Sequence, residues 1–348
     1  MADLVGVIEA AYRADLSDRR WVAGLVEAAR PLLDDGVGVF AGLYDAADVG
    51  RFRMHTMAGS GVVMQGWARL LGLAARRVDP EHIRAVFHHS TCGTLSETIG
   101  EQFLRENTLA RQVARVGIRD SLGINGADPS GAGVILCAPQ RRIGPVAAAT
   151  ADTWSRIAAH LAAGLRLRRQ MSHLAATAPC GGAADPMARA EAVLDPDGRL
   201  AHAVGDARSD ESRVALRAAA IALDRARGRL RRRDPDQAVE LWTALVDSRW
   251  TVVDHFDGDG RRFVIAQRNE PVAPPCDALT RRERQVLAYV AMGRSNKLIA
   301  YHLGVAVSTV ASHVSSASAT LGANSRVELI RRFLASGSRA SDPRPGTA

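Results

Sequence analysis

Residues 279–326 read LTRRERQVLAYVAMGRSNKLIAYHLGVAVSTVASHVSSASATLGANSR, and the pattern of these residues indicates how the last part of the chain folds. Thr280 and Glu283 have the spacing of a capping box, in which side chain and backbone groups satisfy each other at the start of a helix. Apolar residues then recur at helical spacing as far as Gly293, and glycine favours the backbone conformation that ends a helix. The sequence therefore predicts a helix between Thr280 and Gly293.

Two more glycines divide the rest of the stretch. Ser295 is a typical residue to begin a helix, and Gly304 makes a tight turn after it. A longer helix is predicted from about Val307 to Leu321, and a fourth helix over Ser325–Leu334. A short helix, a glycine turn and a longer helix are the architecture that places one helix in the major groove of DNA. We therefore predict an all-α, four-helix helix-turn-helix domain at residues 277–335.

The longer helix leaves one side free of large residues. Its apolar positions repeat on one stripe, and the opposite side carries short side chains that let the backbone approach bases and phosphates. That free side holds Ser308, Thr309, Ala311, Ser312, Ser315 and Ser316.

The basic charge of the chain is concentrated in the same region. The chain has a formal net charge of +8. Residues 279–334 hold eight Lys and Arg residues against two acids, Glu283 and Glu328, so the rest of the chain is close to neutral. A basic excess confined to one small module suits a polyanionic partner for that module. Double-stranded DNA is such a partner.

The quoted stretch resembles the DNA-binding domain of LuxR-type transcription regulators. The shared features are LTxRE at the start, GxSNKxIA in the centre, an LG turn, TVxxH and a closing LG…SR, and they cover about one-sixth of the chain. The resemblance implies binding to double-stranded DNA as a homodimer, under a variable N-terminal sensor. It also implies that Lys297 clamps a phosphate and that Arg326 begins a helix that supports dimer contacts. The predicted DNA-binding residues are Arg294, Ser295, Asn296, Lys297, Ser308, Thr309, Ala311, Ser312, His313 and Ser316.

Three positions depart from the family pattern. Ala306 stands where a serine usually caps the recognition helix, a loss of about 1 kcal/mol. Ala311 and Thr320 stand where basic residues are common, so the recognition helix has no Lys or Arg. Fewer phosphate contacts predict weak non-specific affinity and a shallow salt dependence. An alternative therefore stays open: a ligand-binding sensor or enzyme whose C-terminal helical module is a protein-interaction domain.

The residues before this domain read as two α+β blocks between linkers. The segment 175–186 is rich in Ala, Gly and Pro, and the segment 270–276 has three prolines within five residues, so both predict linkers. Residues 1–174 show helix, antiparallel strands, helices, two strands across GADPSG and a final long helix, which indicates a GAF-like sensor domain. Residues 187–269 show a hairpin turning at Asp195–Gly198, helices, and a hairpin turning at Asp257–Gly260, which indicates a PAS-like module. Residues 336–348 are polar and Pro/Gly-rich, and predict a disordered tail.

Within 1–174, the strand-like runs are Gly36–Tyr44, Arg51–Ala58, Asp120–Asn125 and Gly133–Pro139, and the helical runs are Leu4–Leu33, Val62–Ala75, Pro80–His89 and Val146–His173. Trp21, Trp67 and Trp154 could line a ligand cavity, but large aromatic residues more often fill a core, and we prefer that interpretation.

Other candidate sites are weaker. His82, His88, His89 and Cys92 could bind a metal, but His82 and His88 are off one helical face, and we interpret them as helix-end residues. The basic run Arg225–Arg233 is either a solvated face or a second nucleic-acid or dimer contact. The four cysteines are far apart, so neither disulfides nor a zinc site is indicated.

We predict no enzyme activity, no metal and no cofactor. The chain has no Walker-type phosphate loop, and Lys297 is its only lysine, so the lysine of a phospho-receiver domain is missing. A small-molecule signal at the N-terminal domains is the expected input. No run of 18 apolar residues and no secretory signal is present, so we expect a cytoplasmic protein that does not contact a membrane.

Overall fold

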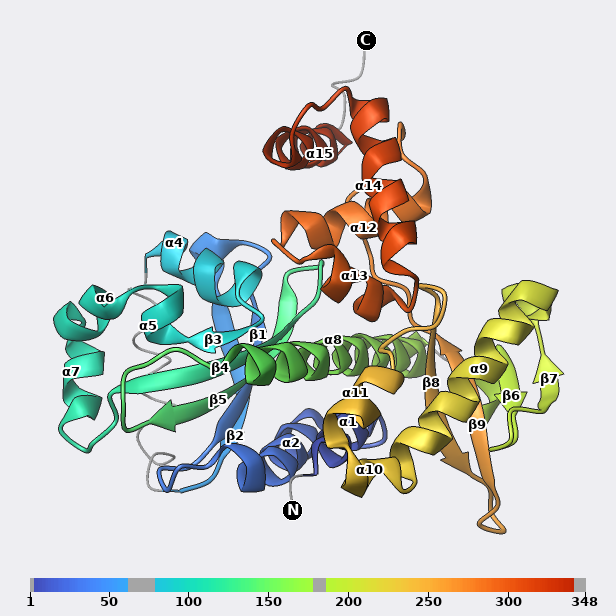
Figure 1. Cartoon of the computed structure of the whole chain (residues 1–348), viewed down its shortest axis with the longest axis horizontal. Helices are drawn as coiled ribbons and strands as arrows, with labels where there is room; N and C mark the ends of the chain where they lie inside the picture. The colour runs from blue at the N-terminus through green and yellow to red at the C-terminus, as the bar shows by residue number, and fades with distance from the viewer. Residues whose placement is uncertain (1–2, 62–78, 178–185, 341–348) are drawn as a thin grey trace.

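The computed structural model describes residues 3–61, 79–177 and 186–340. Two antiparallel sheets lie at opposite ends of the molecule, and the long helix α8 (Ala148–Thr177) runs through the centre towards both (Figure 1). The last helices stand on one side of α8. The predicted mixed α/β N-terminal region followed by a helical C-terminal region is therefore confirmed.

The first sheet has the strand order β2-β1-β5-β4-β3, and all neighbours are antiparallel. Four of its strands were predicted to within a few residues, whereas β3 is too short to show a pattern. The strands are β1 (Phe40–Asp45), β2 (Arg53–Gly59), β3 (Cys92–Thr94), β4 (Asp120–Ala127) and β5 (Ala132–Gln140).

Both faces of this sheet are covered, which explains why its central strands are almost continuously apolar. Along β5, Val134 and Leu136 pack in one core cluster, with helices α1 (Leu4–Ala11), α2 (Asp18–Leu33) and α8. Ile135 and Cys137 point to the opposite face, because successive side chains of a strand alternate.

Short helical segments cover that opposite face. The predicted helix Pro80–His89 is in fact an α-helical turn followed by a π-helical segment, and residues 95–114, for which no helix was predicted, are also helical. The segments are α4 (Pro80–Ile83), the π-helix η2 (Arg84–His89), α5 (Leu95–Thr98), α6 (Glu101–Glu106) and α7 (Thr108–Ala114). The predicted helix Val62–Ala75, with Trp67, lies outside the described residues.

The predicted helix Leu4–Leu33 is interrupted at residues 12–17 and forms α1 and α2. The break lets Tyr12 leave the helix surface and reach His160 of α8, with 2.8 Å between Oη and Nδ1. Trp21 and Trp154 belong to the core cluster, as their interpretation as core residues predicted.

The second sheet has the order β7-β6-β9-β8, and both predicted hairpins are confirmed. One apolar cluster extends from the first sheet through α1 and α8 to residues of this sheet and its helices, among them Leu194, Val239 and Trp242. The elements are β6 (Ala192–Leu194), β7 (Leu200–Ala203), α9 (Asp210–Arg227), α10 (Leu230–Arg233), α11 (Pro235–Leu241), β8 (Trp250–Phe256) and β9 (Arg262–Arg268), with 3₁₀ turns η3 (Met187–Arg189) and η4 (Gly205–Arg208). A further 3₁₀ turn, η1 (Val49–Arg51), lies between β1 and β2 of the first sheet.

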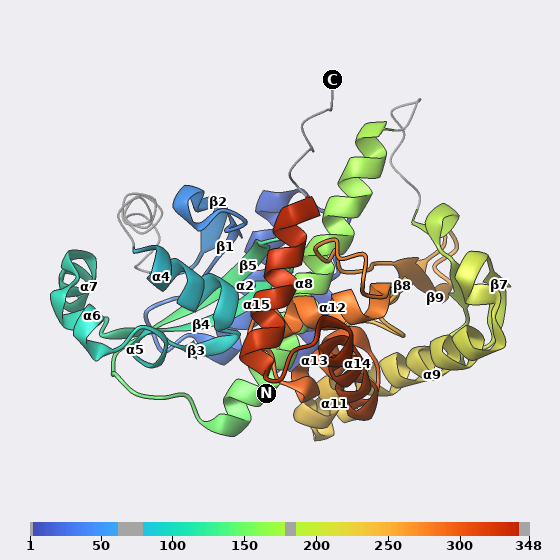
Figure 2. The same ribbon diagram turned by 90° about the horizontal axis from the view of Figure 1, so that it is seen from above.

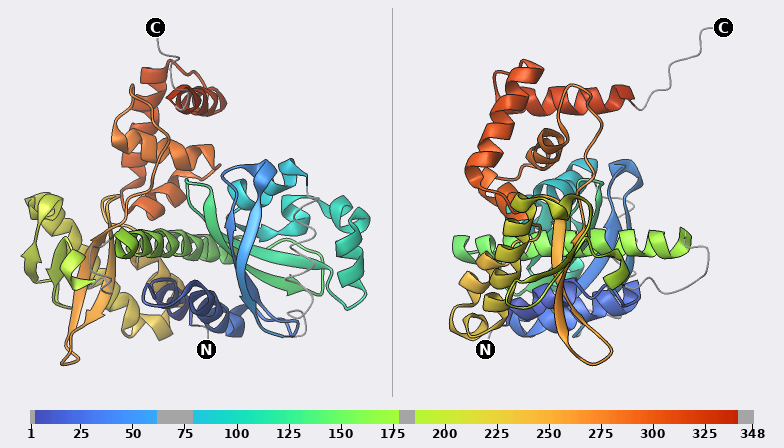
Figure 3. Two further views of the ribbon diagram at one scale, coloured as in Figure 1. Left: turned by 180° about the vertical axis from the view of Figure 1, so that it is seen from behind. Right: turned by 90° about the vertical axis from the view of Figure 1, so that its right-hand side faces the viewer.

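The C-terminal helices follow a segment, residues 269–280, without helix or strand. They lie over the middle of α8 when seen from above (Figure 2), on the side of α8 away from α1 and α2 (Figure 3). The helices are α12 (Arg281–Ala291), α13 (Asn296–Leu303), α14 (Val307–Leu321) and α15 (Arg326–Ala340). Since α15 continues to Ala340, the first residues of the predicted disordered tail are helical, a correction to that prediction.

Among the described helices, none by itself has the length and apolar character to cross a membrane. Taken together, α13 and α14 meet that length and composition test as a pair bent by 109°.

Candidate DNA-binding domain

The ends of the C-terminal helices are determined by the residues that the sequence singled out. Thr280 and Glu283 form the predicted capping box at the start of α12. Ser295 accepts a hydrogen bond from the backbone N–H of Leu298 and caps α13. Ala306 caps α14 without a side-chain hydrogen bond, as the departure from the family pattern predicted.

Glu283 does more than cap its helix. The carboxylate is 6 % exposed and also accepts a hydrogen bond of 2.6 Å from the Ser316 hydroxyl of α14. Burial acts to raise the pKa of Glu283, but the hydrogen bonds from Ser316 and Thr280 outweigh it and hold the pKa below its ordinary value. This carboxylate therefore joins the start of α12 to the middle of α14.

The predicted recognition helix α14 turns an open side to solvent. Val310 and Ala317 are fully buried against α12 and α13, whereas Ser308, Thr309, Ala311 and Ser312 are exposed. His313 is half-buried. These short exposed side chains would let a nucleic-acid backbone come close to the helix. Ser316 is exposed too, but its hydroxyl is already used by Glu283.

The basic residues at the start of α13 face the N-terminal region in this conformation. Lys297 Nζ lies 3.0 Å from Oδ2 of Asp152 in α8. Arg294 is 3 % exposed and donates a hydrogen bond of 2.6 Å from Nη1 to the carbonyl of His89 in η2. Burial lowers the pKa of Arg294 to about 10. Their predicted role in DNA binding stays a prediction, since both side chains are engaged elsewhere in the chain.

Asn296 and Arg326 make contacts within the domain. Arg326 at the start of α15 donates from Nη2 to the Arg294 carbonyl at 2.8 Å, and from Nη1 to Asn296 Oδ1 at 3.3 Å. These bonds tie the beginning of α15 to the beginning of α13. Arg326 therefore stabilises the turn that presents Arg294 to η2.

A tight turn before β8 contacts the glycine of the helix-turn-helix. Gly304 has φ 63°, a conformation that favours glycine, and a Cβ placed there would overlap the carbonyl oxygen of Leu245. The next residues of the turn, Asp247 and Ser248, also have positive φ, and the Ser248 N–H donates to the Leu303 carbonyl at 2.6 Å. Two successive non-glycine residues with positive φ persist only where their surroundings fix them.

A third contact with the N-terminal region is aromatic and centres on the fully buried His160. His160 of α8 lies between the hydroxyl groups of Tyr12 and Tyr301, each 2.8 Å from an imidazole nitrogen. Tyr301 belongs to α13 and donates to the carbonyls of Val239 and Trp242. Burial lowers the pKa of His160 to about 3. The docked domain is thus held by η2, by α8 and by the turn at residues 245–248.

Two arginines of the basic run pair with acidic residues of other elements. Within the basic run Arg225–Arg233, Arg227 forms ion pairs with Glu9 and Asp254, and Arg231 forms ion pairs with Asp3 and Glu9. These two arginines therefore bind the second module to α1, a role that neither interpretation of the run anticipated. No charge pattern in the sequence indicates which acids lie opposite them.

The candidate metal ligands of the first domain do not lie together around one point. His82 packs edge-on against Phe103, with 4.9 Å between ring centroids, and His88 Nε2 lies 2.8 Å from the Ala46 carbonyl oxygen. Within residues 3–61, 79–177 and 186–340, no three His, Cys, Asp or Glu side chains are placed to hold a metal ion.

Comparison with known families defines the C-terminal domain. Residues 277–333 match the GerE family, described as bacterial regulatory proteins, luxR family. These residues are a LuxR-type helix-turn-helix domain, the DNA-binding module of bacterial transcription regulators. No curated protein matches the chain.

Among solved structures, the chain is similar to SdiA from Escherichia coli, with 13 % sequence identity over 93 % of this chain and 94 % of that chain. The TM-score is 0.27, which is too low to relate the arrangement of the two folds.

Proposed function

We propose that this chain is a sequence-specific, DNA-binding transcription regulator in which the N-terminal modules control the helix-turn-helix domain. Residues 1–174 act as a GAF-like sensor and residues 187–269 as a PAS-like module, and the protein works as a cytoplasmic homodimer on promoter DNA. The LuxR-type domain at residues 277–333, with an exposed small-residue side on α14, supports DNA binding.

The observation that supports control of DNA binding by the N-terminal modules is the ion pair between Lys297 and Asp152. The family resemblance implies that Lys297 binds a phosphate, yet here a carboxylate of α8 occupies it. A phosphate that approached Lys297 would also meet the negative charge of Asp152. Docking of the domain on α8 therefore weakens DNA binding, and a signal that separates them restores it.

The control operates through the geometry of the dimer as well. Two recognition helices must reach successive major grooves one helical turn apart. A domain held on α8, η2 and the turn at 245–248 has a fixed direction relative to its own sensor. Release of these contacts gives each helix-turn-helix the freedom to meet its half-site.

The experiment selects binding sites from a random DNA pool and measures affinity by fluorescence anisotropy at several salt concentrations. Lys297→Ala should weaken binding and reduce the salt slope by about 1. Asp152→Asn should strengthen binding by up to about fivefold, because an exposed ion pair contributes roughly 0.2–1 kcal/mol. Asp210→Asn, on the fully exposed start of α9, changes the net charge by the same amount and should have a smaller effect.

Two results would refute the proposal. A wild-type protein that ignores DNA even at low salt would favour the alternative, a protein-interaction module without DNA contact. Equal effects of Asp152→Asn and Asp210→Asn would show that net charge alone sets the affinity, and that α8 does not control the domain.

A further inference from the structure

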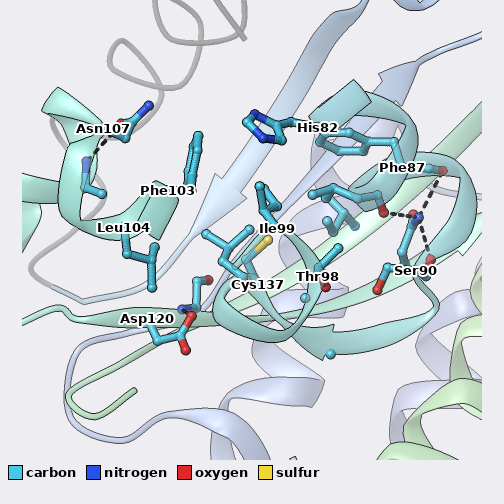
Figure 4. A pocket seen from close by; sticks show the side chains of 18 of the residues that line it. His82, Phe87, Ser90, Thr98, Ile99, Phe103, Leu104, Asn107, Asp120 and Cys137 are labelled. Atoms are coloured by element: carbon cyan, nitrogen blue, oxygen red, sulfur yellow. Dashed lines mark hydrogen bonds between the residues drawn. The ribbon is translucent and has the colours of Figure 1, made fainter. Parts of the chain in front are cut away.

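A cavity of about 200 Å³ lies between the first sheet and the segments α4 to α7. Figure 4 shows side chains from both sides turned towards it, among them Phe87, Ile99, Phe103, Leu104 and Cys137. Its described lining is overwhelmingly aromatic and aliphatic. The cavity is on the opposite face of the sheet from α8, so it does not belong to the DNA-binding domain.

The buried polar side chains in its wall are already satisfied. Asn125 donates to the carbonyls of Val86, Phe87 and Ser90 and accepts from the Tyr44 hydroxyl. Asp120, which is 2 % exposed, accepts hydrogen bonds from Ser96. Away from Arg119, an exposed residue that also lines the cavity, a charged ligand group would lose its hydration with little in return. An occupant is therefore neutral and mainly apolar.

The volume limits the size of the occupant. A cavity of about 150 Å³ holds a benzene molecule. The present cavity is somewhat larger, so it fits a molecule of one or two rings. The hydroxyl groups of Ser90 and Thr98, both close to Gly93 in the cavity wall, can orient one polar atom of such a molecule.

The wall of the cavity is directly connected to the helix-turn-helix domain through η2. Val86 and Phe87 of this π-helix line the cavity. The Phe87 ring packs against Phe52 at 4.4 Å and Tyr44 at 4.7 Å between centroids. Two residues further along the same segment, the His89 carbonyl accepts the hydrogen bond from the buried Arg294. Isolated π-helical turns are frequent at functional sites.

We propose that a small neutral apolar molecule of one or two rings binds in this cavity and stabilises η2 in the position in which the His89 carbonyl holds Arg294. A ligand favours the conformation that contains its site, and the cavity is formed here with the domain docked. Its binding therefore keeps the helix-turn-helix docked and opposes DNA binding. The consequence for DNA rests on the proposed function, whereas the binding and its effect on Arg294 do not.

The test uses 2-naphthol, a neutral two-ring probe, and its anionic relative 2-naphthoate. Isothermal titration should show binding of 2-naphthol and at least tenfold weaker binding of 2-naphthoate. Gly123 lines the cavity, and a Cβ added there would make only ordinary contacts of 3.7 Å. Gly123→Val places three carbon atoms in the cavity and should weaken 2-naphthol binding at least tenfold. Gly123→Ala should weaken it less, and Gly144→Val, where a Cβ meets nothing within 4 Å, should bind like wild type.

The coupling is measured by hydrogen exchange of peptides that cover residues 293–300. With 2-naphthol at 100 times its dissociation constant, exchange there should slow, by at most about 100-fold. Arg294→Met removes the donor to the His89 carbonyl; it should still bind 2-naphthol, but exchange should no longer respond. Equal affinity of wild type and Gly123→Val would overturn the site, and unchanged or faster exchange in wild type would overturn the coupling. Both readouts need no DNA, so they separate this inference from the proposed function.

Discussion

Lowering the pH from 7.5 to 5.0 should reduce the free energy of unfolding by about 2 kcal/mol through one side chain, His160. Its imidazole is fully buried, and burial lowers its pKa to about 3, whereas an unfolded histidine has a pKa of about 6.5. At a pH between these two pKa values, the His160 imidazole is protonated in the unfolded chain and neutral in the folded chain. Stability is therefore lost as the pH falls below about 6.5, at about 1.4 kcal/mol per pH unit.

The hydrogen bonds explain why a proton is not accommodated. The Tyr301 hydroxyl gives its proton to backbone carbonyls, so it accepts from Nε2, and Nδ1 is left to accept from Tyr12. A second proton, on Nδ1, would have to displace the Tyr12 proton. The nearest other acceptor for Tyr12 is the Ala244 carbonyl, at 3.4 Å.

The assay is urea unfolding followed by tryptophan fluorescence at several pH values, because the Trp242 ring is 5.7 Å from the imidazole between centroids. His160→Gln removes the titrating group, so the difference in stability between wild type and variant should shrink by about 2 kcal/mol from pH 7.5 to 5.0. His202→Gln, at an exposed position in β7, should keep the wild-type pH slope. The same slope in wild type and His160→Gln would refute the reasoning.

Two further predictions concern the C-terminal domain. Gly304→Ala and Gly322→Ala both place alanine at positive φ, at a cost of about 1 kcal/mol each. The new Cβ at position 304 overlaps the Leu245 carbonyl, whereas the new Cβ at position 322 meets only the flexible end of Arg332, at 3.0 Å. Hydrogen exchange of residues 244–250 should therefore become faster in Gly304→Ala alone, and equal exchange in both variants would contradict the docking contact. Thr280→Ala should destabilise α12 by about 1 kcal/mol through loss of the cap, and hydrogen exchange of the α12 amides measures this loss. Thr280→Ser keeps the hydroxyl group, so an equal loss of stability in that variant would show that the cap is not the cause.

The helix-turn-helix domain could be predicted from the sequence because its signals are local. The capping box of Thr280, the helix-ending glycines and the apolar repeat all act within a few residues, and each is found in place in the structure. The hairpins around Asp195–Gly198 and Asp257–Gly260 were predictable for the same reason. Turn residues specify their own backbone geometry wherever the turn lies in the fold.

The segments around the cavity were not predictable in this way. Residues 95–114 form helices of four to seven residues, too short to show a 3.6-residue repeat. The π-helical segment η2 reads like an ordinary helix end in the sequence. The side chain that donates to its carbonyls, Asn125, is more than thirty residues away along the chain. A cavity made by such elements leaves no pattern in the sequence.

A basic helical domain of the LuxR type, after a mixed α/β region, could be read from the amino-acid sequence, because helix caps, periodicity and charge are properties of neighbouring residues. The contacts of Arg294 and Lys297, in contrast, depend on tertiary packing. Their partners, His89 and Asp152, are 205 and 145 residues away along the chain. Pairing across such distances depends on how the packed layers meet, and no spacing within a single segment encodes it.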